Sequence, residues 1–341
     1  MVNGTVLRRI ALSAAAVAAT SAAVVLVPRT VGATWAGVHA TLGALTARDV
    51  GLLTILWLAG LAAHSFVLTA SLPGLSTLRA LTLNLTGSAV ANVMPLGGAA
   101  GVSLNFAMAR AWGFSPRSFR TFTAVSNLLS ILAKLVAGTT GIALVIAAGR
   151  SPDWPAAVLR SIVAVMVVVV PVVVAVVLSE RVTRALGAGL DGAVAGVARV
   201  VRSRSRTDLR TSLPGLRCDT AEVVRDRWGR LTGAMASYLA LQGALLWTCL
   251  HLLGVTPGIV VLVAALAVDR LLTMVPITPA GAGVVEAGTV AVLVALGADP
   301  VPATSAVLLY RAFTFLLEIP VGGAAIAVWL VHRRTVAVAA A

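Results

Sequence analysis

PLGG at residues 95–98 and PAGAG at residues 279–283 break two stretches of this chain that are otherwise apolar enough to cross a membrane. Proline lacks an amide donor and glycine is conformationally permissive, so each motif is expected to end a helix. The breaks lie 184 residues apart, and the same offset places Gly113 on Gly297 and Pro116 on Pro300. The chain therefore looks like a duplicated unit. Broken helices at matching positions of two membrane repeats indicate a substrate site, because unwound backbone in lipid is tolerated only around a cavity.

The composition is that of an integral membrane protein. Hydrophobic residues make up 59% of the chain and charged residues 11%, and the mean hydropathy is +0.99, far outside soluble usage. Runs near the length that spans hydrocarbon occur at about 10–27, 50–70, 121–148, 157–178, 231–253 and 303–331, and two more, at about 80–113 and 258–298, contain the breaks. We predict an all-α polytopic integral membrane protein with about six full transmembrane helices plus two broken or re-entrant helical hairpins. The alternative is eight or more full spans.

The net charge of +14 indicates orientation rather than nucleic-acid binding. Most basic residues fall in segments that one topology places on a single side: near Arg8 and Arg9, in residues 179–230, and at Arg333 and Arg334. By the positive-inside rule, the N-terminus, the loop 179–230 and the C-terminus are predicted to be cytoplasmic in a multi-pass protein of the cell membrane. Arg8 and Arg9 also precede the first run as in a signal peptide, but without a clear cleavage site we expect a retained helix.

This topology makes the two units an inverted repeat. The span at 50–70 must run inward and its partner at about 234–254 outward, and each unit consists of a span, a broken hairpin and a long closing helix. Two re-entrant hairpins, one from each side, would meet near the middle of the membrane. The predicted organisation is an N-terminal transmembrane helix and external segment (1–49), membrane repeat 1 (50–148), a connecting transmembrane helix (149–178), a basic cytoplasmic loop (179–230), membrane repeat 2 (231–332) and a C-terminal tail (333–341).

Some ionisable residues are predicted to lie within hydrocarbon, where a charge costs about 2.5 to 3.5 kcal/mol and needs a partner or a cavity. They are Lys134, Asp269, Arg270, Glu286, Arg311 and Glu318. Asn127 and Lys134 are seven residues apart on one closing helix, as are Arg311 and Glu318 on the other, so each pair shares a helix face. We predict a structural charge pair between Lys134 and Glu318, with Arg311 left to face the cavity. The alternative is that Glu318 pairs locally or reaches an interface.

Glu286 follows the second break at the start of the returning half helix. A carboxylate there either caps the helix, which is the commoner case, or exchanges a proton. The backbone amides of Gly281 and Gly283 would suit a phosphate oxygen. Asp269 and Arg270 are adjacent, so we expect them to point apart and not to pair with each other.

No pattern in the sequence indicates a catalytic, metal or cofactor site. The two cysteines and four histidines are scattered without ligand spacing, and a lone membrane histidine is more often a packing or hydrogen-bonding residue. Nucleotide-binding loops, nucleophile elbows and dinucleotide fingerprints are absent from the sequence. We therefore expect a protein that is not an enzyme and that needs no metal and no cofactor.

Residues 276–286 read PITPAGAGVVE and are followed by Leu296-Gly297 and by Leu309-Tyr310-Arg311. This pattern resembles the signature of the lysylphosphatidylglycerol synthase transmembrane (flippase-like) family, best over 265–330 and more weakly over 80–145. In that family the break usually has glycine where Ala280 stands here. Unit one departs further, because Val102, Ser103 and Asn127 stand where members often have an acidic residue and an arginine.

The resemblance implies that the chain binds or translocates a phospholipid or polyprenyl-linked lipid, as the membrane domain of that family without its soluble aminoacyltransferase domain. The predicted substrate-binding residues are Pro279, Gly281, Gly283, Glu286, Arg311 and Asn127. The expected partners are membrane lipids with anionic headgroups, and not nucleic acid. The alternative function is a non-transporting membrane scaffold or accessory subunit of an envelope-lipid pathway, whose partners would be envelope-lipid synthesis enzymes.

Overall fold

The computed structural model describes residues 28–29, 32–94, 97–149, 209–274, 278 and 281–339, and of 209–214 and 334–339 only the backbone. All the longer elements in these ranges are helical, as predicted for the fold class. They are α2 (Trp35–Gly43), α3 (Ala47–Ser71), α4 (Thr77–Val93), α5 (Gly97–Ala111), α6 (Pro116–Ala147), α9 (Leu209–Leu252), α10 (Ile259–Leu272), α11 (Val284–Ala295), α12 (Pro300–Arg311), η2 (Ala312–Leu316) and α13 (Glu318–Ala339). The runs predicted at 10–27 and 157–178 lie outside the described residues, as do residues 95–96 and 279–280 of the breaks.

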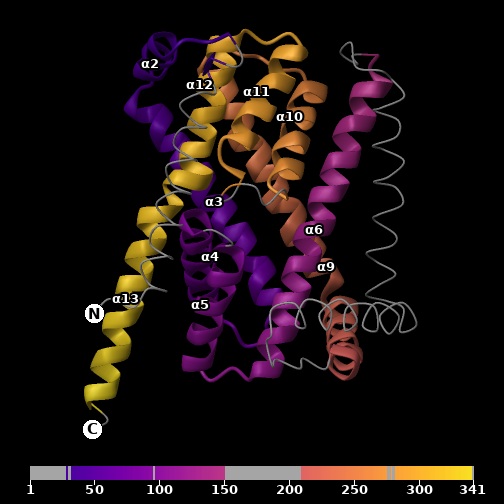
Figure 1. Cartoon of the computed structure of the whole chain (residues 1–341), viewed down its shortest axis with the longest axis vertical. Coiled ribbons are helices and arrows are strands. Elements are labelled where there is room, and N and C mark those ends of the chain that lie inside the picture. The colour runs from indigo at the N-terminus through magenta and orange to yellow at the C-terminus, as the bar shows by residue number, and fades with distance from the viewer. Residues whose placement is uncertain are drawn as a thin grey trace, which may run out of the picture.

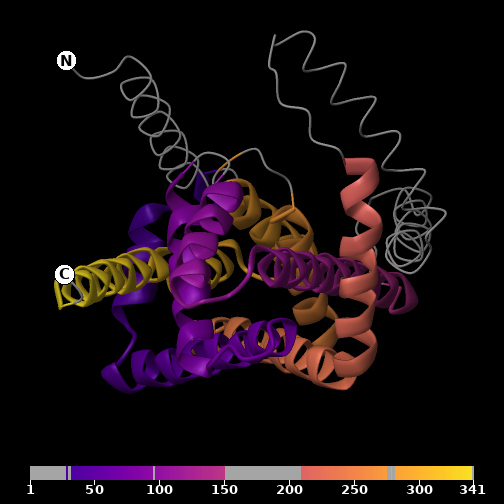
Figure 2. The same cartoon turned by 90° about the horizontal axis from the view of Figure 1, so that it is seen from below.

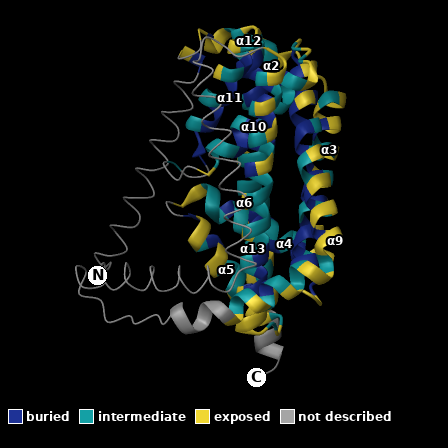
Figure 3. Ribbon diagram, turned by 90° about the vertical axis from the view of Figure 1, so that its right-hand side faces the viewer, coloured by how far each residue is buried: buried dark blue, intermediate teal, exposed yellow. Residues whose placement is uncertain are grey.

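Four helical segments of the described chain are long and apolar enough to cross a membrane: Ala47–Ser71, Pro116–Ala147, Gly215–Leu252 and Pro300–Arg333. They match four of the full spans predicted from the sequence. Large apolar side chains stay exposed on all four of them (Figure 3), and 66% of Ile55, 52% of Val136, 43% of Trp247 and 69% of Val328 is accessible. Contiguous apolar surface of this kind is stable in lipid and not in water. The protein is therefore a multi-pass membrane protein.

Two pairs of shorter helices extend from opposite ends of the molecule (Figure 1). Helices α4 and α5 contain 17 and 15 residues, and α10 and α11 contain 14 and 12. At a rise of about 1.5 Å per residue, each helix is shorter than the roughly 30 Å of a hydrocarbon core. In both pairs, the helix ends that flank the Pro/Gly break lie near the middle of the molecule (Figure 1).

Equivalent helices of the two units pack reciprocally. Helix α3 packs against α9, α6 of unit one packs against α10 of unit two, and α13 of unit two packs against α4 of unit one. Gly138 allows α6 to approach α10, since a Cβ at this position would meet the side chain of Leu271. Gly322, which stands 184 residues after Gly138, allows α13 to approach α4 at the backbone of Leu85. Matching glycines thus serve matching contacts.

Each helix pair is held by an apolar cluster. The larger cluster joins α10, α11 and α12 to α3 and α9, and includes the buried residues Leu53, Leu246 and Tyr310. The other joins α4 and α5 to the start of α6, and includes Phe119 and Phe122. Burial of apolar surface in these clusters positions both pairs relative to the long helices.

The turns that follow the two helix pairs have the same conformation. Gly113 has a φ of 90° and Gly297 a φ of 97°, in the left-handed region that favours glycine. In each turn, the amide after the glycine donates to a carbonyl of the preceding helix, at 3.0 Å in unit one and 2.9 Å in unit two. Both turns lead into a helix with proline in its first turn, α6 and α12. The match that the sequence predicts is repeated in the backbone geometry.

Residues 209–230 fall within the predicted basic cytoplasmic loop 179–230, and in the structure they are helical. They form the first half of α9 and run across the lower end of the molecule (Figure 2). Two hydrogen bonds of 2.7 Å from Arg117, at the start of α6, hold Asp219 of this segment. Charged residues mark the end of an apolar span but do not end a helix, because arginine and glutamate are good helix formers.

The closing helix of unit two is also interrupted, at a place that the hydropathy does not reveal. Helix α12 ends at Arg311, and a π-helical turn, Ala312–Leu316, separates it from α13. The closing helix of unit one, α6, continues without such a turn. Single π-turns inside helices are often found at functional sites.

Candidate functional site

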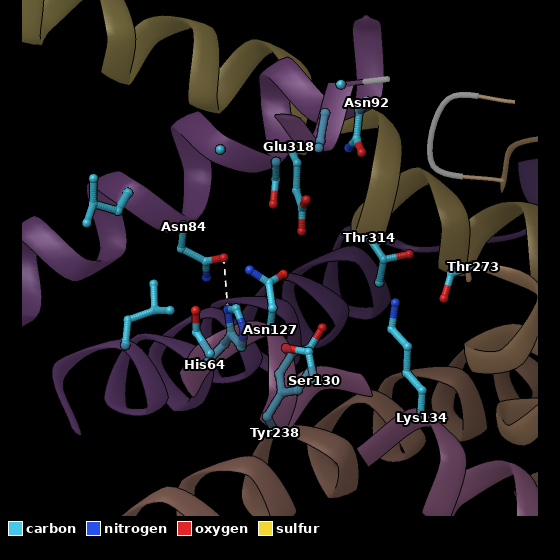
Figure 4. A pocket seen from close by; sticks show the side chains of 18 of the residues that line it. His64, Asn84, Asn92, Asn127, Ser130, Lys134, Tyr238, Thr273, Thr314 and Glu318 are labelled. Carbon is cyan, nitrogen blue, oxygen red and sulfur yellow. Dashed lines mark hydrogen bonds between the residues drawn. The ribbon is translucent and has the colours of Figure 1, made fainter. Parts of the chain in front are cut away.

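A cavity of about 940 Å³, lined by both polar and apolar side chains, lies between the two units. Helices α3, α4, α5, α6, α9 and α10 line it together with the segment from α12 to α13. Its polar lining comprises His64, Asn84, Ser88, Asn92, Asn105, Thr123, Ser126, Asn127, Ser130, Lys134, Tyr238, Gln242, Arg270, Thr273, Thr278, Arg311, Thr314 and Glu318, many of which Figure 4 shows. Polar and charged side chains within a membrane protein face one another or a water-filled space, so this cavity is the candidate site.

Unit one lines the cavity mainly with uncharged polar side chains. Asn84 Oδ1 lies 3.0 Å from His64 Nδ1 (Figure 4), and the ring of His64 packs at 4.9 Å from that of Tyr238. Asn127 Nδ2 donates to Thr123 O at 2.8 Å. His64 is therefore a hydrogen-bonding and packing residue, as predicted. The structure places Asn127 in the cavity lining, where the sequence predicts a binding residue.

Unit two contributes a buried ion pair between α11 and α12. Arg311 Nε donates to Glu286 Oε1 at 2.8 Å, and only 7% and 3% of the two side chains are exposed. Gly283 N donates to the other carboxylate oxygen at 2.6 Å. The guanidinium of Arg311 also lies over the ring of Phe315, 5.0 Å from its centroid. Glu286 therefore caps α11, which confirms the capping alternative, and binds Arg311, which lines the cavity.

A second buried ion pair joins Asp269 to Arg270, and the prediction that these residues do not pair is wrong. Arg270 Nε donates to Asp269 Oδ2 at 2.8 Å, and a terminal nitrogen of Arg270 donates to the Tyr310 hydroxyl at 2.6 Å. The Tyr310 hydroxyl donates to Gln242 Oε1 at 3.4 Å. Adjacent helical positions do diverge at Cβ, but the long arginine side chain turns back, because an unpaired buried carboxylate would cost several kcal/mol.

The glycines of the second break do not offer free amides. Gly281 N donates to Thr278 O at 3.0 Å, and Gly283 N donates to Glu286. The prediction of a phosphate site at these amides is therefore wrong for this conformation of the chain. The glycines are needed for shape, since Gly281 has a φ of 71° and Gly283 a φ of 87°. Gly281 lines the cavity, whereas Gly283 and Glu286 do not. Pro279 is outside the described residues.

Lys134 and Glu318 both line the cavity (Figure 4). Among the described residues, no ion pair within 4.0 Å joins them. The charges that act on Lys134 are those of Arg270 and Asp269, and those that act on Glu318 come from Arg311 and Arg270. The direct pair that the sequence predicts is not formed in this structure, and their energetic coupling stays a prediction.

The π-turn supplies cavity residues that the sequence does not indicate. Thr314 and Phe315 lie in it and line the cavity, and Glu318 opens the helix that follows. Asn92 Nδ2, at the end of α4, donates to Phe315 O at 3.1 Å. This bond joins the first helix pair to the closing segment of unit two. Asn92 is recognisable in the sequence as a polar residue inside an apolar run, but its partner lies 223 positions away.

One protein family matches this chain over most of its length. The family described as the lysylphosphatidylglycerol synthase TM region matches residues 6–322 of the 341. The matched range contains both helix pairs and all the described residues that line the cavity. A comparison with proteins of curated function finds no match.

Proposed function

This chain belongs to the lysylphosphatidylglycerol synthase transmembrane family, and on that premise we propose that it binds a phosphate-bearing membrane lipid and moves the headgroup across the bilayer. The observation that carries the proposal is a cavity of about 940 Å³ with charged and carboxamide side chains in its lining, inside a protein that exposes large apolar side chains on its long helices. Keeping ionised and carboxamide groups at this depth is costly, and a polar solute passing through is the usual reason for it.

The two units act as an inverted repeat with re-entrant helix pairs. Three observations support this arrangement: the pairs extend from opposite ends of the molecule, equivalent helices pack reciprocally, and the turns at Gly113 and Gly297 share one conformation. In such repeats, one unit rocks against the other around a site near the bilayer middle. The headgroup would pass between the helix pairs while the tails stay in lipid.

The lower end of the molecule in Figure 1 is the cytoplasmic one in this proposal. Exposed basic residues cluster there at the ends of α4, α5 and α6, among them Arg79, Arg110, Arg117 and Arg120. The basic first half of α9 runs across the same end. By the positive-inside rule, this clustering supports a cytoplasmic position for the N-terminus, residues 179–230 and the C-terminus of a cell-membrane protein.

A cavity-filling variant tests the proposal. Ser130 lines the cavity, whereas its neighbour Ile131 is 39% exposed and does not line it, so Ser130→Phe and Ile131→Phe add similar bulk to α6 in different places. The full chain is reconstituted into vesicles that contain a tail-labelled phospholipid or polyprenyl phosphate, and an impermeant quencher reports the label that reaches the outer leaflet. We expect faster exchange than in protein-free vesicles, loss of that exchange with Ser130→Phe, and wild-type exchange with Ile131→Phe.

The same assay decides between transport and a scaffold. If the wild-type protein moves neither lipid faster than protein-free vesicles do, the alternative of a non-transporting scaffold or accessory subunit replaces the proposal. If Ser130→Phe and Ile131→Phe exchange lipid equally well, lipid movement does not use this cavity.

A further inference from the structure

The ion pairs leave two charged side chains of the cavity available to a ligand. Among the described residues, four charged ones line it: Lys134, Arg270, Arg311 and Glu318. Arg270 is bound by Asp269 and Arg311 by Glu286, so each guanidinium is neutralised in place. Lys134 and Glu318 remain, one cation and one anion.

Neither remaining charge is satisfied by a counter-ion within the described chain. No salt bridge to Lys134 or to Glu318 is formed by any described residue, and Ser88 is the polar side chain that interacts with the Glu318 carboxylate. Residues 275–277 and 279–280, which are outside the described residues, are Val, Pro, Ile, Pro and Ala and include no ionisable residue. A charge kept at membrane depth without a counter-ion needs another source of compensation.

The two side chains enter the cavity from different helices. Lys134 comes from α6 of unit one and Glu318 from the start of α13 in unit two, and both point into the same open space (Figure 4). Uncharged polar groups, including Asn127 and Thr314, lie around that space. A ligand that fills it would meet a cationic group on one side, an anionic group on the other and hydrogen-bonding groups between them.

We infer that Lys134 and Glu318 form a two-point site for a zwitterionic phospholipid headgroup, with the phosphate at Lys134 and the ammonium at Glu318. The inference rests on the proposed function and specifies its substrate class as the phosphoethanolamine type, which carries both charges on one headgroup. It also reassigns the two residues from a structural pair to ligand-binding groups.

Charge balance gives this site its selectivity. A headgroup that carries only a phosphate would pair with Lys134 and leave Glu318 without a counter-ion beside a second negative charge. A headgroup with excess positive charge would pair with Lys134 through its phosphate and with Glu318 through one ammonium, and its additional cation would have no anion of the cavity lining left to pair with. Only a zwitterion completes both pairs without an additional charge, and leaving a buried charge unpaired is a strong element of discrimination.

Binding to the detergent-purified full chain tests the inference. Short-chain lipids with identical tails and a phosphoethanolamine, phosphoglycerol or lysyl-phosphoglycerol headgroup are titrated, and the shift of the unfolding midpoint gives each affinity. We expect the phosphoethanolamine lipid to bind about tenfold more tightly than either other lipid, as one additional charge-assisted bond provides. Glu318→Gln should make the phosphoethanolamine and phosphoglycerol lipids bind alike, and Lys134→Met should weaken both by about tenfold.

Glu222→Gln is the matched control, because Glu222 is an exposed glutamate of α9 outside the cavity, and it should keep the wild-type preference. The inference would be overturned if the wild-type protein bound the three lipids equally, a measurement that does not depend on any variant folding. It would also be overturned if Glu318→Gln kept the wild-type preference for the phosphoethanolamine lipid. Lipid movement is measured separately in vesicles. Selective binding without movement would refute the proposed function alone, and movement with unselective binding would refute this inference alone.

Discussion

Unit one (50–148) and unit two (231–332) have corresponding helix contacts and turns but use their polar residues differently. The offset of 184 residues that relates them places Val102 and Asn127 of unit one on Glu286 and Arg311 of unit two. In unit two these positions hold a buried ion pair that ties α11 to α12. In unit one both positions line the cavity, and α5 packs less extensively on α6 than α11 does on α12.

We attribute the open cavity to this difference between the two units. An ion pair closes the helix pair of unit two onto its closing helix, and the absence of that pair in unit one leaves the equivalent space open. The charged residues of unit two that look most like a binding site in the sequence therefore hold the structure together. The uncharged residues of unit one face the space that a ligand would fill.

Breaking the pair of unit two should have the largest effect. Arg311→Met leaves Glu286 buried without its counter-ion, for which the expected loss is about 3 to 5 kcal/mol of unfolding free energy. Adding Glu286→Gln to Arg311→Met should recover most of that loss, because no uncompensated charge then remains. The measurement is denaturant unfolding of the purified protein, followed by tryptophan fluorescence.

Arg120→Met is the control for this experiment, since Arg120 is an exposed arginine on α6. It should unfold as the wild type does. A loss for Arg311→Met no larger than that for Arg120→Met would show that the pair does not stabilise unit two, and the proposed difference between the units would fail.

Much of this architecture could be predicted from the sequence, because lipid imposes simple rules. A span needs a long apolar run, and an interruption needs proline or glycine, so the long helices and both breaks are visible in the residues. The capping role of Glu286 is local in the chain and follows from its distance to the break. The match of Gly113 with Gly297 is visible because both turns need a positive φ.

The pairing of the charged side chains could not be predicted, because it depends on contacts between distant segments. Arg311 binds a residue on another helix, and Asn92 binds the backbone of Phe315, so neither partner follows from helical spacing. Arg270 pairs with the adjacent Asp269 because a buried carboxylate without a counter-ion would be strongly destabilising. The π-turn has no sequence signature, and it changes which side chains α13 presents to the cavity.

Building a pair in unit one should have an intermediate effect. Val102→Glu and Asn127→Arg together place in unit one the residue types that stand at the equivalent positions of unit two. The unfolding free energy of the double variant should exceed the value obtained by adding the effects of the two single substitutions by about 1 to 2 kcal/mol. We also expect the new pair to close the cavity, so that lipid exchange falls to the rate in protein-free vesicles.

The control for the built pair is Val102→Gln with Asn127→Gln, which changes the same positions without opposite charges and should show no coupling. Denaturant unfolding measures the coupling and the vesicle assay measures the exchange. Full exchange in a variant with strong coupling would mean that the open space at these positions is not the path of the headgroup.

The smallest effect on stability is expected for the coupling between Lys134 of unit one and Glu318 of unit two. No ion pair joins Lys134 and Glu318, and other charges act on each of them. The changes in unfolding free energy caused by Lys134→Met and Glu318→Met should therefore add to within about 0.5 kcal/mol in lipid-free detergent. The same cycle repeated with saturating phosphoethanolamine lipid should become non-additive, because a bound zwitterion connects the two side chains. Strong coupling without lipid would restore the structural pair and remove both charges from the binding site. Glu286 and Arg311 of unit two neutralise each other, and so do Asp269 and Arg270, whereas Lys134 and Glu318 enter the cavity from different units and would each pair with a group of the bound headgroup.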